Sequence, residues 1–298
     1  MKKNRLGKTG MEVSVVTFGG IVCTDEQPRD CERFVSYAIE RGVNYFDVAP
    51  EYGNAQERLG PALAPYRKDV YLGCKSMLRG ADAETELFDS LKLLHTDYFD
   101  LYMIHALITQ DEVETIFGPG GAMEVLIRAK EAGYIRHIGI TAHGETAAIQ
   151  ALAYYDFETV MFPVNWALNI DRGYGDKIIN ICKYRDLGLL AIKILAHRAF
   201  AGESEEKREP KAWVKTIYDN DEFALAALKY TLAKGVDTLI PPGNFGQFSF
   251  VVEHIDECLE NPLTDSDRKY LEEELKLIEG RHIVDENGQY YGTFTKQY

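Results

Sequence analysis

The stretch VSVVTFGGIVCT (13–24) begins as an apolar, β-branched run and continues past a pair of glycines. Its composition predicts a first strand over 13–20. An open, doubly wound α/β sheet usually carries a glycine-rich phosphate loop directly after its first strand. Neither GxGxxG nor a P-loop pattern follows here, which favours a closed barrel over the open sheet.

Seven more runs of this kind follow, and each precedes a helical pattern. The further strands are expected at 43–49, 70–76, 99–106, 135–142, 159–166, 187–195 and 236–243. Helices are expected near 29–41, 54–64, 83–95, 121–132, 145–153, 176–186, 221–234 and 246–259. Eight units of strand then helix predict parallel pairing with right-handed crossovers, and a (β/α)8 TIM barrel uses all eight.

The segments outside these units complete the predicted α/β architecture. KNRLGKTGMEV (3–13) is expected to form an N-terminal hairpin that caps the barrel floor, and 264–280 an extra C-terminal helix. The connections 107–120 and 196–220 are long, and both leave the C-terminal ends of strands, where barrel enzymes place their active sites. We therefore expect a single barrel domain over 1–298.

Charge and composition narrow the class of partner. The net charge is −14 and the acidic residues are spread along the chain, so nucleic acids and anionic membrane surfaces would be repelled. No apolar run approaches the roughly 18 residues of a membrane span, and the N-terminus lacks the apolar core of a secretory signal. We expect a cytoplasmic protein that acts on a small molecule. The sequence does not predict its oligomeric state.

The segment FDVAPEYGNAQERLG (46–60) closes the second strand and opens a helix. Asn54 and Glu57 have the spacing of a capping box, and Gly53 eases the turn before it. Asp47 and Tyr52 are needed by neither the cap nor the turn. A carboxylate such as Asp47 has to be solvated or paired, which predicts a partner elsewhere in the chain.

Two further polar residues fall at the same level of the predicted barrel. Lys75 ends the third strand and His105 the fourth, beside the strand that carries Asp47. Each alone has an ordinary structural explanation: a lysine that reaches for water, a core histidine, or a tyrosine that covers the rim. An acid, a phenol, an amine and an imidazole at adjacent strand ends together indicate a functional site.

The acidities of these groups indicate their chemistry. A free tyrosine has a pKa of about 10. The ammonium of Lys75, held by Asp47, is expected to lower the pKa of Tyr52 and make it a general acid. His105 is expected to donate a hydrogen bond that orients a carbonyl oxygen and stabilises the developing alkoxide. This set predicts carbonyl reduction, for which only a hydride donor is missing.

The chain resembles the aldo-keto reductase superfamily, since FDVAPEYGNAQERLG matches that family's signature around its aspartate and tyrosine. The resemblance covers essentially the whole barrel. It implies a (β/α)8 fold, an NAD(P)-dependent oxidoreductase, and the catalytic residues Asp47, Tyr52, Lys75 and His105. It also implies a small-molecule carbonyl substrate that is reduced to an alcohol.

The resemblance further places a nicotinamide cofactor across the barrel mouth, with NADP(H) expected in preference to NAD(H). The cofactor-binding residues it implies are Gly20, Thr141, His143, Asn165, Ile192, Lys193, Leu195, Gly243 and Gln247. The match weakens here. Ala142 replaces the usual asparagine after the fifth strand, and Gln247 stands where an arginine often binds the 2′-phosphate of NADP.

The substrate pocket is the least determined part of the site. Ile21 and Trp213 are the expected substrate contacts, and the same loops also supply Val22, Phe117 and Tyr218. The aromatic tail GQYYGTFTKQY (288–298) is expected to pack on its own barrel. The alternative function is a non-catalytic nucleotide-binding barrel that acts as a redox-sensing or regulatory subunit. A metal-dependent hydrolase has no support, because no HxH or HExxH spacing occurs.

Overall fold

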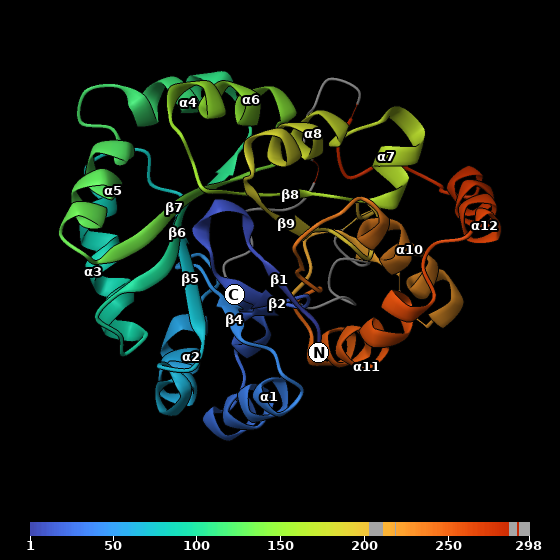
Figure 1. The fold of residues 1–298 in the computed structure, drawn as a ribbon, viewed down its shortest axis with the longest axis horizontal. Coiled ribbons are helices and arrows are strands. Elements are labelled where there is room, and N and C mark those ends of the chain that lie inside the picture. Colours follow the sequence, from blue (N-terminus) through green and yellow to red (C-terminus); the bar gives the residue numbers. More distant parts are fainter. Residues whose placement is uncertain (203–210, 218, 286–290, 292–298) are drawn as a thin grey trace.

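The computed structural model describes residues 1–202, 211–217, 219–285 and 291, and its centre is one parallel sheet of eight strands (Figure 1). Every neighbouring pair in the sheet runs parallel. The strands are β3 (Phe18–Gly19), β4 (Tyr45–Asp47), β5 (Tyr71–Ser76), β6 (Phe99–Leu107), β7 (Ile135–Ala142), β8 (Thr159–Pro163), β9 (Gly188–Ile192) and β12 (Thr238–Leu239).

The two edges of this sheet meet and close the barrel. Val16, just before β3, forms a parallel bridge with Leu239 of β12. The amide of Thr17 donates to the carbonyl of Leu239 at 2.8 Å. The predicted (β/α)8 barrel is therefore confirmed, since all eight strands are joined around the ring.

Helices follow the strands in the predicted order. They are α1 (Pro28–Glu40), α2 (Ala55–Leu63), α3 (Ala83–Leu93), α5 (Ala122–Glu131), α6 (Glu145–Tyr154), α8 (Asp176–Arg185), α10 (Asp221–Ala233) and α11 (Phe245–Glu260). Within the described part of the chain, the α-helices α4 (Gln110–Phe117) and α7 (Trp166–Arg172) were not predicted. The first lies in the expected loop 107–120 and begins at a capping box made by Thr109 and Glu112.

The predicted first strand is divided into two. β1 (Lys3–Arg5) and β2 (Glu12–Ser14) form the expected antiparallel hairpin, and the barrel strand β3 starts only at Phe18. The backbone bends directly after Ser14, at Val15, and the hydroxyl of Ser14 donates to the carbonyl of Val16 at 2.7 Å. The residues that were predicted as one strand over 13–20 therefore serve both the hairpin and the barrel.

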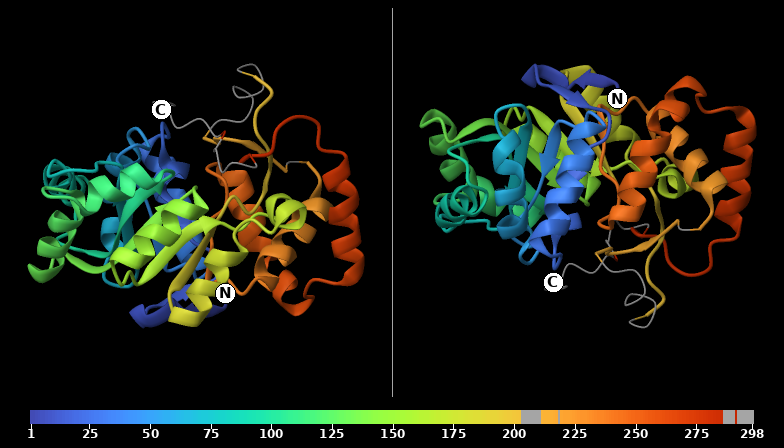
Figure 2. Two further views of the ribbon diagram at one scale, coloured as in Figure 1. Left: turned by 90° about the horizontal axis from the view of Figure 1, so that it is seen from above. Right: turned by 90° about the horizontal axis from the view of Figure 1, so that it is seen from below.

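The hairpin and the long connection after β9 lie at opposite ends of the barrel (Figure 2). Within that connection, β10 (Ala196–Arg198) and β11 (Lys215–Thr216) pair antiparallel. The extra C-terminal helix is α12 (Asp265–Lys276), which packs on α10 and α7. Among the described residues, no helix has both the length and the apolar character needed to span a bilayer.

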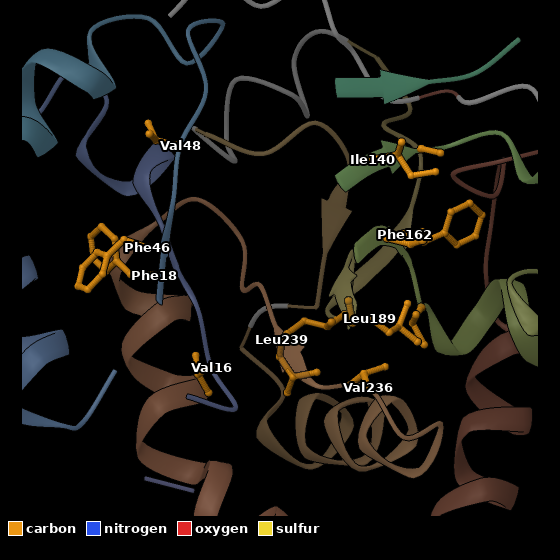
Figure 3. Packing of buried hydrophobic residues seen from close by; sticks show 14 of the residues in the cluster. Val16, Phe18, Phe46, Val48, Ile140, Phe162, Leu189, Val236 and Leu239 are labelled. Carbon is orange, nitrogen blue, oxygen red and sulfur yellow. The ribbon is translucent and has the colours of Figure 1, made fainter. Parts of the chain in front are cut away.

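Buried side chains fill the layer between the barrel and its helices. Phe18 and Phe46 lie side by side on neighbouring strands, with ring centroids 5.2 Å apart (Figure 3). Phe248 of α11 meets Phe18 edge-on at 5.0 Å. A second cluster, which includes Leu6 of the floor and Met103 of β6, fills the barrel interior. This packing holds the strand ends in fixed positions around the mouth.

Candidate active site

The four predicted catalytic residues line one pocket at the C-terminal ends of the strands. Asp47 is the last residue of β4, Lys75 lies in β5, and His105 in β6. Tyr52 comes from the turn between β4 and α2. Parallel pairing of three adjacent strands is what brings these residues, up to 58 positions apart in the chain, to one place.

Asp47 and Lys75 form a buried ion pair below the tyrosine. The lysine Nζ donates to Oδ2 of Asp47, and only 1% and 4% of the two side chains are exposed. Burial alone would lower the pKa of Lys75, but Asp47 and Tyr52 raise it above its ordinary value. The amine is therefore charged at neutral pH, and its Nζ lies 5.0 Å from the centroid of the Tyr52 ring.

The acidity of Tyr52 differs from the prediction. Burial raises its pKa to about 12, although the charge of Lys75 opposes this change. The expectation that Lys75 would bring the pKa below its ordinary value is wrong for this state of the pocket, because removal from water outweighs the ammonium. At neutral pH the phenol is protonated.

The predicted capping box at Asn54 is also wrong. α2 begins after Asn54 without a hydrogen bond from its side chain. The Oδ1 atom of Asn54 instead accepts from the backbone amide of Asp25 at 2.8 Å. This residue therefore ties the loop after β3 to the turn that carries Tyr52.

A backbone irregularity in β6 accompanies His105. The register between β6 and β7 shifts between Ile104 and Leu107, and Ala106 has a left-handed φ of 56°. Such bulges re-aim a side chain near active sites, and a left-handed alanine is strained. The hydroxyl of Thr141 accepts from the amide of Ala106 at 2.6 Å and holds this conformation.

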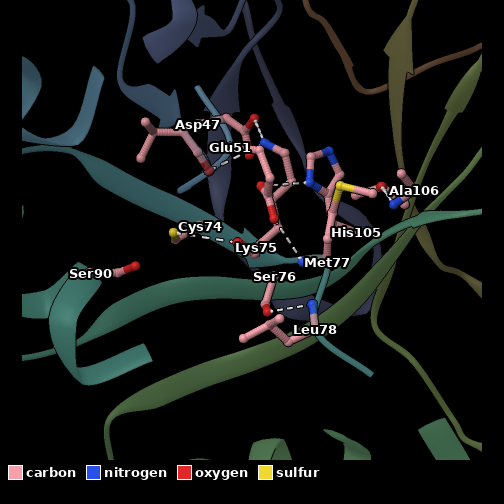
Figure 4. Close-up of polar contacts among 12 residues, drawn as sticks. Asp47, Glu51, Cys74, Lys75, Ser76, Met77, Leu78, Ser90, His105 and Ala106 are labelled. Atoms are coloured by element: carbon pink, nitrogen blue, oxygen red, sulfur yellow. Dashed lines mark hydrogen bonds and ion pairs between the residues drawn. The ribbon is translucent and has the colours of Figure 1, made fainter. Parts of the chain in front are cut away.

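Glu51 also lines the pocket, although it is not among the predicted site residues. Its Oε2 lies 3.1 Å from Nδ1 of His105 (Figure 4). The rings of His105 and Tyr52 meet edge-on with centroids 6.1 Å apart. The one signal in the sequence was the position of this acid, directly before the tyrosine. Its partner, 54 residues away, gave no local sign.

On the other side of the mouth, the predicted cofactor-binding residues divide into two groups. The pocket wall contains Thr141, His143, Ile192, Lys193 and Gly243, together with the predicted substrate contacts Ile21 and Trp213. Gly20, Asn165, Leu195 and Gln247 are buried but do not line it. Seven of the eleven residues predicted for this side of the mouth therefore line the pocket.

Asn165 and Gln247 use their amide groups within the protein. Asn165 caps α7 by accepting from Leu168, and it donates to the carbonyls of Lys193 and Ala196 at 3.0 and 2.7 Å. Gln247 bonds the backbone carbonyl of Ile217 at 3.0 Å. These contacts join helices to the loop after β9, so neither amide is presented to a ligand.

The glycines in this region serve close packing. A Cβ atom on Gly20 would lie 2.8 Å from the side chain of Val48. On Gly243 it would lie 2.4 Å from the carbonyl oxygen of Lys211. The backbone that comes close to Gly243 is thus the segment after β9.

The remaining pocket predictions have different outcomes. Phe117 stacks on Tyr154 with centroids 4.9 Å apart and does not line the pocket, and Val22 is buried beside it. Tyr291 donates to Asp285, six positions away, at 3.0 Å, and the packing of the tail on the barrel stays a prediction. Tyr218 of the predicted pocket loops lies outside the described residues, as do the other aromatic residues of the tail, Tyr290, Phe294 and Tyr298.

Comparison with known proteins decides the family. The aldo/keto reductase family model matches residues 16–243. The chain belongs to this family. It is 27% identical to probable aldo-keto reductase 1 of Glycine max over 283 residues, 80% of this chain and 79% of that protein. An oxidoreductase of Bacillus subtilis, YqkF, is 29% identical and matches 48% of this chain and 49% of its own length.

Solved structures of aldo-keto reductases share the fold. An aldo-keto reductase from Bacillus halodurans in its holo form superposes with a TM-score of 0.70 at 23% identity, over 97% of this chain and 100% of that one. Members of the aldo/keto reductase family are oxidoreductases that use a nicotinamide cofactor and act on small carbonyl compounds. The protein is accordingly an aldo/keto reductase-type oxidoreductase.

The pocket of this aldo/keto reductase fits a nicotinamide cofactor. The residues that line it include Glu51 and Gly243, and part of the lining is apolar, as at Met161 and Ile192. Lys193 lies in the wall with a left-handed φ of 63°, and burial lowers its pKa to about 7. An amine in the pocket wall can donate to the phosphate oxygens that the cofactor carries.

Proposed function

We propose that the protein reduces the carbonyl group of a small aldehyde or ketone to an alcohol, and that Tyr52 gives the proton to the oxygen. The observation that supports this most directly is the buried ion pair of Asp47 and Lys75 beneath the Tyr52 ring, in a pocket that also contains His105. When bound, a reduced nicotinamide supplies hydride to the carbonyl carbon.

Tyr52 is suited to act as the acid. Its pKa of about 12 keeps the phenol protonated at neutral pH. An alkoxide is a far stronger base than a phenolate, so proton transfer to the product oxygen is downhill. The phenolate that remains lies beside the ammonium of Lys75, which stabilises it until a proton from solvent restores the phenol.

NADP(H) is the proposed cofactor in preference to NAD(H). Lys193 and Lys211 both line the pocket in a chain whose net charge is −14. The amine of Lys211 bonds Glu26 at 2.5 Å, and its backbone passes close to Gly243. These two basic side chains can donate to phosphate oxygens, which supports the nucleotide with the additional phosphate.

The test is a Tyr52→Phe variant assayed with a panel of aldehydes and ketones. The phenylalanine keeps the ring that packs 5.5 Å from Trp213 and removes only the proton donor. We expect carbonyl reduction to fall by roughly 10²- to 10⁴-fold while nucleotide affinity stays nearly unchanged. Quenching of Trp213 fluorescence measures that affinity.

The result also separates the two functions considered for the barrel. A wild-type protein that binds NADPH and reduces no member of the panel would support the regulatory alternative. Reduction that persists in Tyr52→Phe would show that another group supplies the proton. Binding of NADH as tightly as NADPH would contradict the proposed cofactor preference.

A further inference from the structure

Glu51 connects the imidazole of His105 to the backbone directly after β5. One carboxylate oxygen lies 3.1 Å from Nδ1 of His105, and the other accepts from the amide of Met77 at 3.0 Å (Figure 4). Burial raises the pKa of Glu51, but the contacts with His105 and Met77 outweigh this and lower it. The group is therefore a carboxylate at neutral pH, and both of its oxygens have partners.

A carboxylate in this position determines which ring nitrogen carries the proton. An ionised carboxylate only accepts hydrogen bonds, so Nδ1 of His105 has to be the donor. In the neutral imidazole, the other nitrogen, Nε2, then has a lone pair and no hydrogen. Only the imidazolium form, which Glu51 stabilises, donates through both nitrogens.

Several charged and titratable groups face His105. Burial lowers its pKa below the ordinary value, and Lys75 acts in the same direction. Glu51 and Asp47 oppose this effect. The groups around the ring come from the strands β4, β5 and β7 and from the turn after β4: Asp47, Lys75, His143, Glu51 and Tyr52.

We propose that Glu51 is a positioning residue: it keeps the proton of His105 on Nδ1 and stabilises the imidazolium whose Nε2 donates to the carbonyl oxygen. This inference rests on the proposed carbonyl reduction. It refines the donor role expected of His105, because the neutral ring with Glu51 on Nδ1 has no hydrogen to offer from Nε2. Donation by His105 then depends on protonation of the ring.

The pH dependence follows from this assignment. Reduction that needs the imidazolium is fastest below the pKa of His105 and falls as the pH rises through it. Because burial and Lys75 lower that pKa from its ordinary value, the fall should occur at lower pH than for an unperturbed histidine. Tyr52 stays protonated over this whole range.

A Glu51→Gln variant is expected to move the proton of the neutral His105 ring from Nδ1 to Nε2, while the side chain at position 51 keeps its size and shape. Its amide oxygen can still accept from Met77, while its NH2 group faces Nδ1 of His105 and donates to it. The neutral ring then carries its hydrogen on Nε2 and can donate at any pH. The same change removes the negative charge that stabilises the imidazolium, so the pKa of His105 should fall further.

Nitrogen-15 NMR of the histidine rings tests this assignment without any assay of activity. A His105→Asn variant identifies the signals. In the wild type we expect the neutral ring of His105 to be protonated on Nδ1. In Glu51→Gln we expect protonation on Nε2 and a lower pKa. A ring protonated on Nε2 in the wild type, or a tautomer unchanged by the substitution, would overturn the proposal.

The pH profile of kcat/KM supplies the second measurement, with Glu57→Gln as the matched control. Glu57 lies exposed in the first turn of α2, six positions away, and its substitution removes the same charge. We expect the wild type and Glu57→Gln to lose activity as the pH rises through the pKa of His105, and Glu51→Gln to show a flat profile. An identical acidic limb in all three proteins would refute the role of Glu51.

The outcomes for the two proposals are distinct. No reduction by the wild type with any nicotinamide would refute the proposed function, while the NMR result would still report on the tautomer of His105. Reduction with an unchanged tautomer in Glu51→Gln would refute the positioning role alone. Thermal unfolding of Glu51→Gln near that of the wild type would show that its profile reflects the changed group.

Discussion

The two sides of the barrel mouth use their polar residues differently. On the side of β4, β5 and β6, acidic and basic groups pair with one another at the pocket, as in the contact between Lys75 and Asp47. On the side of β8 and β12, Asn165 and Gln247 bond backbone atoms of the loop after β9 and face away from the pocket. The first side places paired charged side chains at the pocket, whereas these two amides of the second side hold the backbone around it.

The difference arises because a polar residue near a strand end tends to cap a helix that starts directly after it. Asn165 stands directly before α7, and Asn244 directly before α11, and both cap their helices. A helix start leaves amides without partners, so a nearby amide or hydroxyl is often taken by the backbone. The turn after β4 differs, because Glu51 and Tyr52 precede the helix by several residues and stay at the pocket.

The largest effect is expected from Lys75→Met, on the side where charges pair. Asp47 would lose its cation while 4% of its side chain is exposed, which costs about 3–5 kcal/mol in the free energy of unfolding. Carbonyl reduction should fall as well, since the phenolate of Tyr52 would lose its stabilising charge. Urea unfolding and the aldehyde assay measure the two losses.

Lys68→Met is the control for this change, because Lys68 is exposed and follows α2 on the outside. The cost in Lys75→Met should also shrink as the pH falls, since protonation of Asp47 removes the unpaired charge. Equal stability of the two variants would mean that the ion pair contributes nothing measurable, and the contrast between the two sides of the mouth would fail.

A smaller effect is expected from Lys193→Met, which removes a basic side chain from the part of the mouth where we propose that the nucleotide binds. We expect NADPH to bind roughly tenfold more weakly, which corresponds to about 1.4 kcal/mol. The folded-state pKa of Lys193 is about 7, below its ordinary value of 10.5. The stability that goes with this neutral amine is therefore fully present above about pH 10.4 and is lost as the pH falls through 7.

The stability difference between Lys193→Met and the wild type should accordingly favour the variant more at pH 6 than at pH 10. Urea midpoints at several pH values measure this difference, and Trp213 fluorescence measures NADPH affinity. Unchanged affinity for NADPH would show that Lys193 does not contact the nucleotide. A stability difference independent of pH would show that the amine is solvated in the folded protein.

The strand and helix order was predictable because each unit carries its own pattern. The helix α7 was not predicted, since its cap Asn165 and its first residue Trp166 continue the apolar run that predicts a strand over 159–166. The strand 13–20 was predicted as continuous because nothing in its apolar pattern marks the bend at Val15. Local patterns predict elements well and their ends less well.

The site was predictable to the extent that residue type and strand register determine it. Asp47, Lys75 and His105 follow directly from their places on adjacent parallel strands. The role of Glu51 depends on the bulge at Ala106, and the packing role of Gly243 depends on where Lys211 passes. Both depend on contacts between distant segments, which no pattern within either segment specifies.

The smallest effect on nucleotide binding is expected from Gln247→Leu, which tests a residue that lies behind the pocket wall. Gln247 stands where an arginine would favour NADP, yet its amide donates to Thr216 and to the carbonyl of Ile217, both at 3.0 Å. Loss of these bonds should lower the free energy of unfolding by about 1 kcal/mol. The ratio of NADPH to NADH affinity should stay unchanged, because the side chain does not line the pocket. Gln110→Leu, at an exposed position of α4, controls for the change in composition, and a shifted ratio in Gln247→Leu alone would show that this amide contacts the nucleotide after all.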